Sequence, residues 1–235
     1  MTVVKLKINT CILLMVKYPE KGKVKGRLSR ETDETFAVDL YRNFVLDELS
    51  MLERSSIPFV VCFDPADAMK KFKDWLGSEY EYLAQRGEDL GERLSNGLSD
   101  AFSMGVENAI VMGSDIPDLP EKILLEACAA LETNDAVIGP SPDGGYYLIG
   151  FQKTAFLPSV FKGIAWSTET VFRKTVEKLR RVGSSYYTLP SWADIDTLRD
   201  LENLFERSVD SVFSSSKTMM YLSQHREMLG EKFLG

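Results

Sequence analysis

Residues 11–28 read CILLMVKYPEKGKVKGRL, an apolar run followed at once by a basic segment that contains one proline and two glycines. The run Cys11–Val16 has the length and composition of a buried β-strand. Proline and glycine in the segment 17–28 predict a shaped loop there and not a helix. A strand that ends in a polar loop is typical of open α/β sheets, which bind ligands at the carboxyl ends of their strands.

The same alternation of short apolar runs and longer segments of helical period continues along the chain. The further expected strands are Pro58–Phe63, Ala109–Met112, Ala136–Gly139 and Tyr146–Phe151. Segments of helical spacing are 36–52, 90–102, 124–131 and 168–181. Asp33 can cap the first of these helices, and Pro120 fits the first turn of the third. The pattern predicts one α/β domain with a mostly parallel sheet at 1–204. The charged segment 205–235 is expected to be a helical tail that packs on this domain or on a partner.

The amino-acid composition and the net charge exclude some classes of protein. Of 235 residues, 44% are hydrophobic and 27% are charged, and the formal net charge is −7. This acidic balance argues against a binder of nucleic acid or anionic membranes, which would need a basic face. No apolar run approaches the roughly 18 residues of a membrane helix, and the basic start does not read as a signal peptide. We therefore expect a cytoplasmic protein that acts on something small, with oligomerisation possible.

Cysteine and histidine disfavour several kinds of catalysis. Cys11, Cys62 and Cys128 lie far apart among apolar neighbours, and no pair has the spacing of a zinc or redox motif. We expect them to be buried, reduced thiols. The single histidine, His225, has no nucleophile motif beside it, so a Ser-His-Asp or Cys-His mechanism is not indicated. Any metal is then expected to be a hard cation held by carboxylates.

The segment 17–30 contains six basic residues and one acid within an acidic protein. Its lysines supply point charges, and Arg27 supplies a planar fork that can bind phosphate through two hydrogen bonds. The segment has neither the Gly-Lys-Ser/Thr ending of a Walker loop nor the glycine pattern of a dinucleotide-binding fold. Charge alone favours a phosphate-binding loop and a solvated basic loop equally.

Acidic residues follow two other extended stretches. The strand 109–112 leads through Gly113 and Ser114 to Asp115, whose carboxylate can hold Mg²⁺ or Mn²⁺ against phosphate oxygens; an ordinary turn is the local alternative. Asp194 and Asp196, at a spacing of two, lie on one side of an extended segment and can face one cation. Asp196 or Thr197 can alternatively cap the helix that follows.

Two more segments allow either a structural or a functional interpretation. Asp143, Gly144 and Gly145 separate two apolar runs, which favours a hairpin turn, although backbone amides there can also meet a substrate. Ser167 or Thr168 can cap a helix or bind a ligand.

Taken together, these segments resemble the small bacterial GT-A-type transferases of the nucleotide-diphospho-sugar transferase superfamily. The most similar subgroup is a glycosyltransferase-like family with a Lys-x-Pro…Gly-x-Val-Lys-x-Arg-Leu loop. Molybdenum-cofactor guanylyltransferase and 2-phospholactate guanylyltransferase are more distant. The resemblance extends from about Thr10 to Leu201, and its motifs occur in the family's order: the basic loop, 85–93, 113–115, 143–147, 166–168 and 194–197. Two departures are Lys21, where the family has proline, and Gly26, where it has threonine.

The resemblance implies a GT-A (Rossmann-like) three-layer α/β/α sandwich and a role for each matching residue. The implied catalytic residues, which neutralise the phosphates and the leaving group, are Lys17, Lys25 and Arg27. The implied nucleotide-binding residues are Lys17, Gly87, Asp89, Leu90 and Ser114. The implied acceptor-binding or sugar-binding residues are Asp143, Gly144, Gly145, Ser167 and Thr168. The implied ligands of Mg²⁺ or Mn²⁺ are Asp115, Asp194 and Asp196.

The resemblance also implies a metal-dependent transferase that uses a nucleoside triphosphate or a sugar nucleotide and a small acceptor. An acceptor oxygen would attack phosphorus or an anomeric carbon without a protein nucleophile. Glycosyl transfer and nucleotidyl transfer both stay open. The alternative is a non-catalytic module that binds a nucleotide or sugar nucleotide, which the departures at Lys21 and Gly26 would favour. An NAD-dependent oxidoreductase is disfavoured because its glycine motif is missing.

Overall fold

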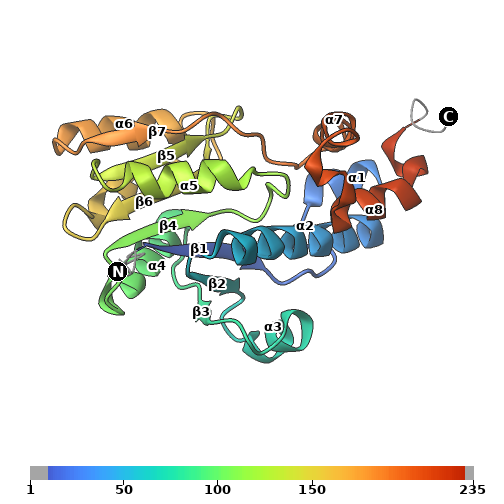
Figure 1. The fold of residues 1–235 in the computed structure, drawn as a ribbon, viewed down its shortest axis with the longest axis horizontal. Helices are drawn as coiled ribbons and strands as arrows, with labels where there is room; N and C mark the ends of the chain where they lie inside the picture. Colours follow the sequence, from blue (N-terminus) through green and yellow to red (C-terminus); the bar gives the residue numbers. More distant parts are fainter. Residues whose placement is uncertain (1–9, 231–235) are drawn as a thin grey trace, which may run out of the picture.

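Seven strands form one sheet within residues 10–230, the part of the chain that the computed structural model describes (Figure 1). The strands are β1 Thr10–Lys17, β2 Phe59–Asp64, β3 Tyr82–Ala84, β4 Asn108–Met112, β5 Ala136–Pro140, β6 Tyr146–Gln152 and β7 Tyr186–Thr188. Their order across the sheet is β3-β2-β1-β4-β6-β5-β7. Strand β6 runs antiparallel to β4 and β5, and the other neighbouring pairs are parallel. The predicted mostly parallel sheet is confirmed.

Helices cover both faces of this sheet. They are α1 Gly26–Glu31, α2 Glu34–Ser55, α3 Met69–Leu76, α4 Leu90–Ser103, α5 Glu121–Ala130, α6 Val171–Arg181, α7 Leu198–Ser208 and α8 Lys217–Gln224. Helices α2, α5, α7 and α8 share one apolar cluster with Ile12 and Leu14 of β1, whereas α4 and α6 share another with Cys11 and Leu13. Alternate residues of β1 thus face opposite layers, as the period of a strand requires. The predicted three-layer α/β/α sandwich is confirmed.

Two expected helix starts can be compared with the structure. Asp33 caps α2, because its carboxylate accepts hydrogen bonds from the backbone N–H of Thr35 (2.7 Å) and Phe36 (3.0 Å). Pro120 immediately precedes α5, which has an acidic residue in its first turn. Asp33 is the cap that the sequence predicted. Pro120 was expected within the first turn of its helix and lies one residue before it.

Other predicted boundaries of helices and strands differ from the structure, each for a local reason. The segment 17–28 is not a loop throughout, because α1 begins at Gly26 and buries Leu28 in the cluster that contains α2. Helix α6 begins at Val171 and not at Thr168, whose hydroxyl donates to the carbonyl of Ala165 (2.7 Å) within a turn. Strands β3 and β7 were missed, since three residues are too few to show a strand period.

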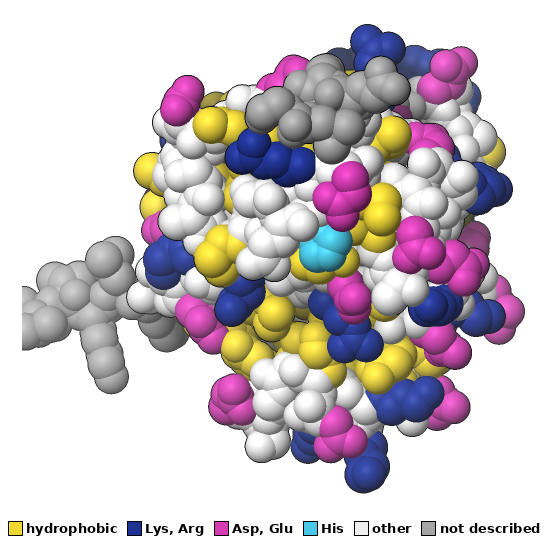
Figure 2. All heavy atoms as spheres, turned by 90° about the vertical axis from the view of Figure 1, so that its right-hand side faces the viewer, with side chains coloured by type: hydrophobic (Ala, Val, Ile, Leu, Met, Phe, Trp, Pro, Cys, Tyr) yellow, Lys and Arg dark blue, Asp and Glu magenta, His cyan; other side chains and the backbone are white. Residues whose placement is uncertain are grey.

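The C-terminal helices pack on the same chain. The carboxylate of Asp47 in α2 accepts hydrogen bonds from the backbone N–H of Lys217 (2.9 Å) and Thr218 (2.8 Å) at the start of α8. Figure 1 shows α7 and α8 next to α1, at the end of the sheet away from α6. Figure 2 shows this side of the molecule, where charged side chains of both signs surround a band of hydrophobic ones. The division at residue 204 stays a prediction, and residues 231–235 lie outside the described part.

The cysteines agree in part with the expectation of buried thiols. Cys11 and Cys62 are buried, Cys128 is partly buried, and all three are free thiols. Burial raises the pKa of the Cys11 thiol to about 11, so this thiol is uncharged at neutral pH. None of the helices within residues 10–230 combines the length and the apolar character needed to cross a bilayer.

Candidate active site

A cleft of about 740 Å³ opens at the carboxyl ends of β1 and β4. Its walls come from the segment 17–30, from residues 85–93, from the turn after β4 and from the segment 194–196. The implied site residues that line it are Lys17, Lys25, Arg27, Asp89, Leu90, Ser114, Asp115, Ser167, Asp194 and Asp196. The structure therefore brings residues from separated sequence motifs to one place, at the sheet edge where α/β proteins bind ligands.

Lys25 lines the cleft and is almost fully buried, with 2% of its side chain exposed. Its ammonium group forms an ion pair with Asp115 and lies 3.5 Å from a carboxylate oxygen of Asp196. It also donates a hydrogen bond to the backbone carbonyl of Ile195 (2.7 Å). Burial lowers the pKa of Lys25, but Asp115, Asp196 and Asp194 outweigh it, so the net pKa is raised and the side chain stays charged.

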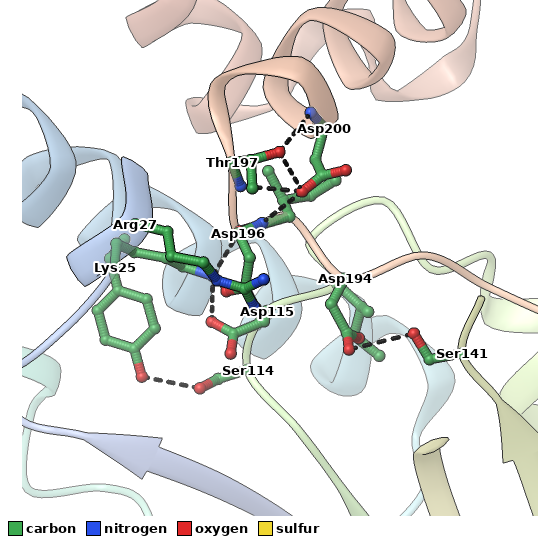
Figure 3. Close-up of polar contacts among 12 residues, drawn as sticks. Lys25, Arg27, Ser114, Asp115, Ser141, Asp194, Asp196, Thr197 and Asp200 are labelled. Atoms are coloured by element: carbon green, nitrogen blue, oxygen red, sulfur yellow. Dashed lines mark hydrogen bonds and ion pairs between the residues drawn. The ribbon is translucent and has the colours of Figure 1, made fainter. Parts of the chain in front are cut away.

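Asp196 connects the basic loop to the start of α7. Its carboxylate accepts a hydrogen bond from Arg27 (2.6 Å), which is 58% exposed at the cleft (Figure 3). Thr197 caps α7, and Asp200 completes a capping box with it. The cap is therefore Thr197, and the side chain of Asp196 is left to face the two cations of the loop.

Asp115 follows β4 through two small residues. The hydroxyl of Ser114 is hydrogen-bonded to the phenol of Tyr41 (2.7 Å), and the backbone N–H of Ile116 donates to Glu48 (3.1 Å). The carbonyl of Asp115 accepts a hydrogen bond from the N–H of Ile195 (2.9 Å), which fixes the turn against the segment that carries Asp194. The turn is thus held on both sides, while 44% of the Asp115 side chain remains exposed to the cleft.

Of the three candidate metal ligands, Asp194 is the one whose negative charge is least compensated by nearby positive groups. Figure 3 shows it directed toward Ser141, whose hydroxyl donates to it at 3.3 Å. Burial, followed by repulsion from Asp115, Asp143 and Asp196, raises the pKa of Asp194 to about 7. Because its neighbours are mostly negative, an added cation would stabilise its ionised form.

By themselves, the carboxylates of Asp115, Asp194 and Asp196 provide only part of a binding site for a hard cation. Within residues 10–230, no three Asp, Glu, His or Cys side chains converge as a ready-made metal cage. Lys25 lies between Asp115 and Asp196, and Asp194 is bonded to Ser141. Mg²⁺, however, is usually bound by one or two carboxylates plus water and substrate phosphates. The partly exposed Asp115 and the incompletely compensated Asp194 fit that mode of binding.

The raised pKa of Asp194 predicts how metal-free stability depends on pH. The unfolded chain releases this proton near pH 4 and the folded chain near pH 7, so the folded chain binds more protons between these values. The contribution of Asp194 therefore destabilises the fold progressively from about pH 4 to pH 7, by an amount on the order of a few kcal/mol. Urea unfolding at pH 5 and pH 8 should show that Asp194→Asn removes this loss. Equal pH dependence in both proteins would contradict it.

The other predicted residues lie around the cleft. Asp89 caps α4 by accepting a hydrogen bond from the N–H of Glu92 (2.8 Å), so this carboxylate has a structural role. Gly87 has a positive φ of 140°, and a side chain there would collide with Glu92. Thr168 and the residues Asp143, Gly144 and Gly145 do not line the cleft itself. Asp143 accepts from the N–H of Gly145 (2.8 Å) in the turn between β5 and β6, which confirms the hairpin.

Several residues of the cleft were not assigned a role, although most of them lie in the segments that carry the resemblance. They are Met15, Lys23, Val24, Gly26, Arg30, Tyr41, Gln85, Glu88, Arg93, Gly113, Tyr146 and Tyr147. Tyr41 accepts a hydrogen bond from the N–H of Lys17 (3.1 Å) and so joins the basic loop to the turn at Ser114. Its position in the apolar pattern of α2 makes it look like an ordinary core residue. Lys23 and Arg30 belong to the basic segment, whose charge was the signal that could have found them.

Several known proteins are similar to this chain in sequence or in fold. The chain is 44% identical to a "putative nucleotide-diphospho-sugar transferase" from Desulfovibrio desulfuricans G20, whose crystal structure it matches with a TM-score of 0.91 over 94% of this chain and 96% of that one. It is 27% identical over 168 residues to 2-phospho-L-lactate guanylyltransferase from Methanocaldococcus infernus, covering 67% of this chain and 75% of that protein. A cytidylyltransferase from Leptospira borgpetersenii shares the fold, with a TM-score of 0.55, 15% identity and coverage of 94% and 96%.

These relatives confirm the predicted resemblance and, with it, the prediction of a transferase. They do not test the roles assigned to single residues. A family profile described as "Uncharacterized protein conserved in bacteria (DUF2064)" matches residues 46–168. Because the match spans more than half of the chain, this protein belongs to the DUF2064 family.

Proposed function

We propose that the chain is a metal-dependent nucleotidyltransferase, which transfers the nucleotidyl group of a nucleoside triphosphate to a small acceptor. The observation that carries the proposal is the ion pair of the buried Lys25 with the partly exposed Asp115, in a cleft that four exposed basic side chains also line. The names of the guanylyltransferase relative and of the cytidylyltransferase neighbour support nucleotidyl transfer as the reaction.

The basic segment is suited to a triphosphate. Lys17, Lys23, Arg27 and Arg30 line the cleft with exposed side chains around the buried Lys25. A triphosphate brings several negative charges, and in a partly dehydrated cleft each added cation lowers their electrostatic cost. Lys17 and Arg27 are assigned to the phosphates and the leaving group, with Lys25 beneath them.

The departures from the family loop do not remove these groups. Lys21 donates a hydrogen bond to Thr35 (2.6 Å) and is absent from the cleft lining, so its role is structural. At Gly26, a side-chain carbon would have no other atom within 4 Å, so the missing threonine leaves space and displaces nothing. Lys25 and Arg27 on either side keep their ion pairs with Asp115 and Asp196. A non-catalytic module is therefore the weaker alternative.

Mg²⁺ or Mn²⁺ is assigned to Asp115, with Asp194 and Asp196 beside it. The cation would supply charge stabilisation to the phosphate oxygens. The carboxylate of Asp115 would orient the triphosphate from the β4 side, and Arg27 and Lys17 would hold it from the β1 side. Asp194, which Lys25 compensates only in part, would become fully ionised in that complex because a further positive charge lowers its pKa.

The proposed reaction needs no covalent protein intermediate. An acceptor oxygen forms a bond to the α-phosphorus while the bond from that phosphorus to the bridging oxygen of the β-phosphate breaks, and pyrophosphate leaves. None of the residues lining the cleft is cysteine or histidine. Holding the two reactants in line can be worth roughly 7–11 kcal/mol of the barrier. The acceptor side is assigned to Ser167, to Thr168, which follows it, and to the hairpin at Asp143, Gly144 and Gly145.

A second candidate, glycosyl transfer from a sugar nucleotide, is favoured by the description of the 44% identical structure. A thermal-shift panel of nucleoside triphosphates and sugar nucleotides, each with and without Mn²⁺, separates the two. A ligand at about a hundred times its dissociation constant adds about 2.7 kcal/mol of stability. Stabilisation by a triphosphate only with Mn²⁺ is the expected result. Stabilisation by sugar nucleotides alone would replace nucleotidyl with glycosyl transfer, and no shift with any compound would contradict both.

A further inference from the structure

Asp118 lies three residues after Asp115 and is not part of the cleft lining. Its carboxylate is buried, with 6% of the side chain exposed. One oxygen accepts a hydrogen bond from the indole N–H of Trp192 (3.2 Å), and the other accepts one from Nε of Arg207 (2.8 Å). This side chain thus joins the turn after β4 to a part of the chain more than 70 residues further on, namely the segment before α7 and α7 itself.

The segment 189–196 carries Asp194 and Asp196 but belongs to no helix or strand. Its first half is held by the backbone N–H of Trp192, which donates to the carbonyl of Pro140 (3.1 Å). Its second half is held by the N–H of Ile195, which donates to the carbonyl of Asp115 (2.9 Å). An irregular segment lacks a ladder of hydrogen bonds, so its position depends on a few such contacts.

We propose that Asp118 is a positioning residue, which fixes Trp192 and thereby keeps Asp194 and Asp196 at the correct distance from Asp115. Arg207 completes the arrangement by neutralising the buried carboxylate. The inference rests on the proposed function, because these three carboxylates are the candidate ligands of the cation. Arg207 belongs to α7 and lies beyond the expected domain boundary at residue 204. The proposal therefore makes α7 a structural part of the site.

The energetics favour such a role. Removing the Asp118 carboxylate takes away the acceptor of the partly buried indole N–H and of the partly exposed guanidinium of Arg207, and so removes two of the contacts that hold this segment. Loss of a group that orients metal ligands typically lowers metal affinity or activity by about 10–100-fold. Asp118→Ala should therefore act on the geometry of the carboxylates, although Asp118 does not itself touch the substrate.

Two measurements on the full chain test this. In hydrogen exchange, Asp118→Ala should accelerate exchange at residues 192–196 by about tenfold or more. In the complex with a non-hydrolysable triphosphate, it should weaken Mn²⁺ binding by about 10–100-fold. Asp118→Asn keeps a carbonyl oxygen for the indole and should lose less in both measurements. Trp192→Phe removes the other side of the same hydrogen bond, so its effect should not add to that of Asp118→Ala.

Asp135→Ala is the matched control. The carboxylate of Asp135 also accepts two hydrogen bonds, from the N–H (2.8 Å) and the hydroxyl (2.9 Å) of Ser185, but it lies at the amino end of β5, away from the cleft. This variant should be less stable than wild type. Its Mn²⁺ affinity and its hydrogen exchange at residues 192–196 should be unchanged.

The inference would be overturned if Asp118→Ala left exchange at 192–196 unchanged, or if Asp135→Ala accelerated it equally. Wild-type protein that binds no triphosphate with Mn²⁺ would refute the proposed function instead, and the exchange measurement would still decide whether Asp118 positions the segment. If exchange accelerates but Mn²⁺ affinity in the complex is unchanged, the link to the carboxylates is refuted.

Discussion

Replacing Asp115 by asparagine is expected to lower kcat/KM for nucleotidyl transfer by about 10³-fold or more. The exposed carboxylate at the end of β4 is the candidate ligand best placed to share a cation with the phosphates. Asparagine keeps the size of the side chain but not the charge, and loss of metal assistance removes several kcal/mol of transition-state stabilisation. The measurement is steady-state release of pyrophosphate with the triphosphate that the binding panel identifies.

The same variant should also lose the Mn²⁺ dependence of triphosphate binding. Asp135→Asn, at the opposite end of the sheet, is the matched control and should retain wild-type rates. A residual rate for Asp115→Asn above one tenth of wild type would show that Asp115 does not hold the cation. A full loss of rate in the control as well would point to a general effect on folding.

Replacing Lys25 by methionine is expected to lower both activity and stability. The ammonium group is buried between Asp115 and Asp196, and removal of one partner of a buried ion pair leaves the other charges uncompensated. Such a change costs about 3–5 kcal/mol in fully buried pairs; the lower end, about 3 kcal/mol, applies here because Asp115 is partly exposed. The rate of transfer should fall about 10²-fold, since a charge next to the phosphates is lost.

The Lys25→Met variant should also respond to metal differently from wild type. With no ammonium group between the carboxylates, Mn²⁺ alone should raise its melting temperature more than that of wild type. Lys21→Met, in the same loop but with a hydrogen bond to Thr35 only, is the control and should resemble wild type in both respects. Equal metal responses in Lys25→Met and wild type would contradict the idea that Lys25 compensates these carboxylates.

Much of the fold could be predicted because it depends on local patterns. The apolar run at 11–16 became β1, and Asp33 became the cap of α2, since both signals are contained in a few adjacent residues. The start of α1 at Gly26 could not be predicted. It depends on the left-handed backbone of Lys25 (φ 50°) and on burial of Leu28, while the local sequence shows only turn residues and charge.

The site could be predicted as a set of residues but not as an arrangement. Lys25 was assigned to the phosphates, yet its contacts are Asp115 and Asp196, which come from parts of the chain that meet only after folding. The same holds for Asp118 and Arg207, whose sequence neighbourhoods suggest nothing of their pairing. Ion pairs between distant residues leave no periodic signal, so only the fold reveals them.

The most direct test of the proposed site is a crystal structure of the protein with a non-hydrolysable nucleoside triphosphate and Mn²⁺, with the metal located by its anomalous scattering. We expect Mn²⁺ bound to the carboxylate of Asp115 and to phosphate oxygens, with Lys17 and Arg27 on the phosphates. Mn²⁺ bound without any contact to Asp115, Asp194 or Asp196, or a triphosphate located outside this cleft, would contradict the proposal.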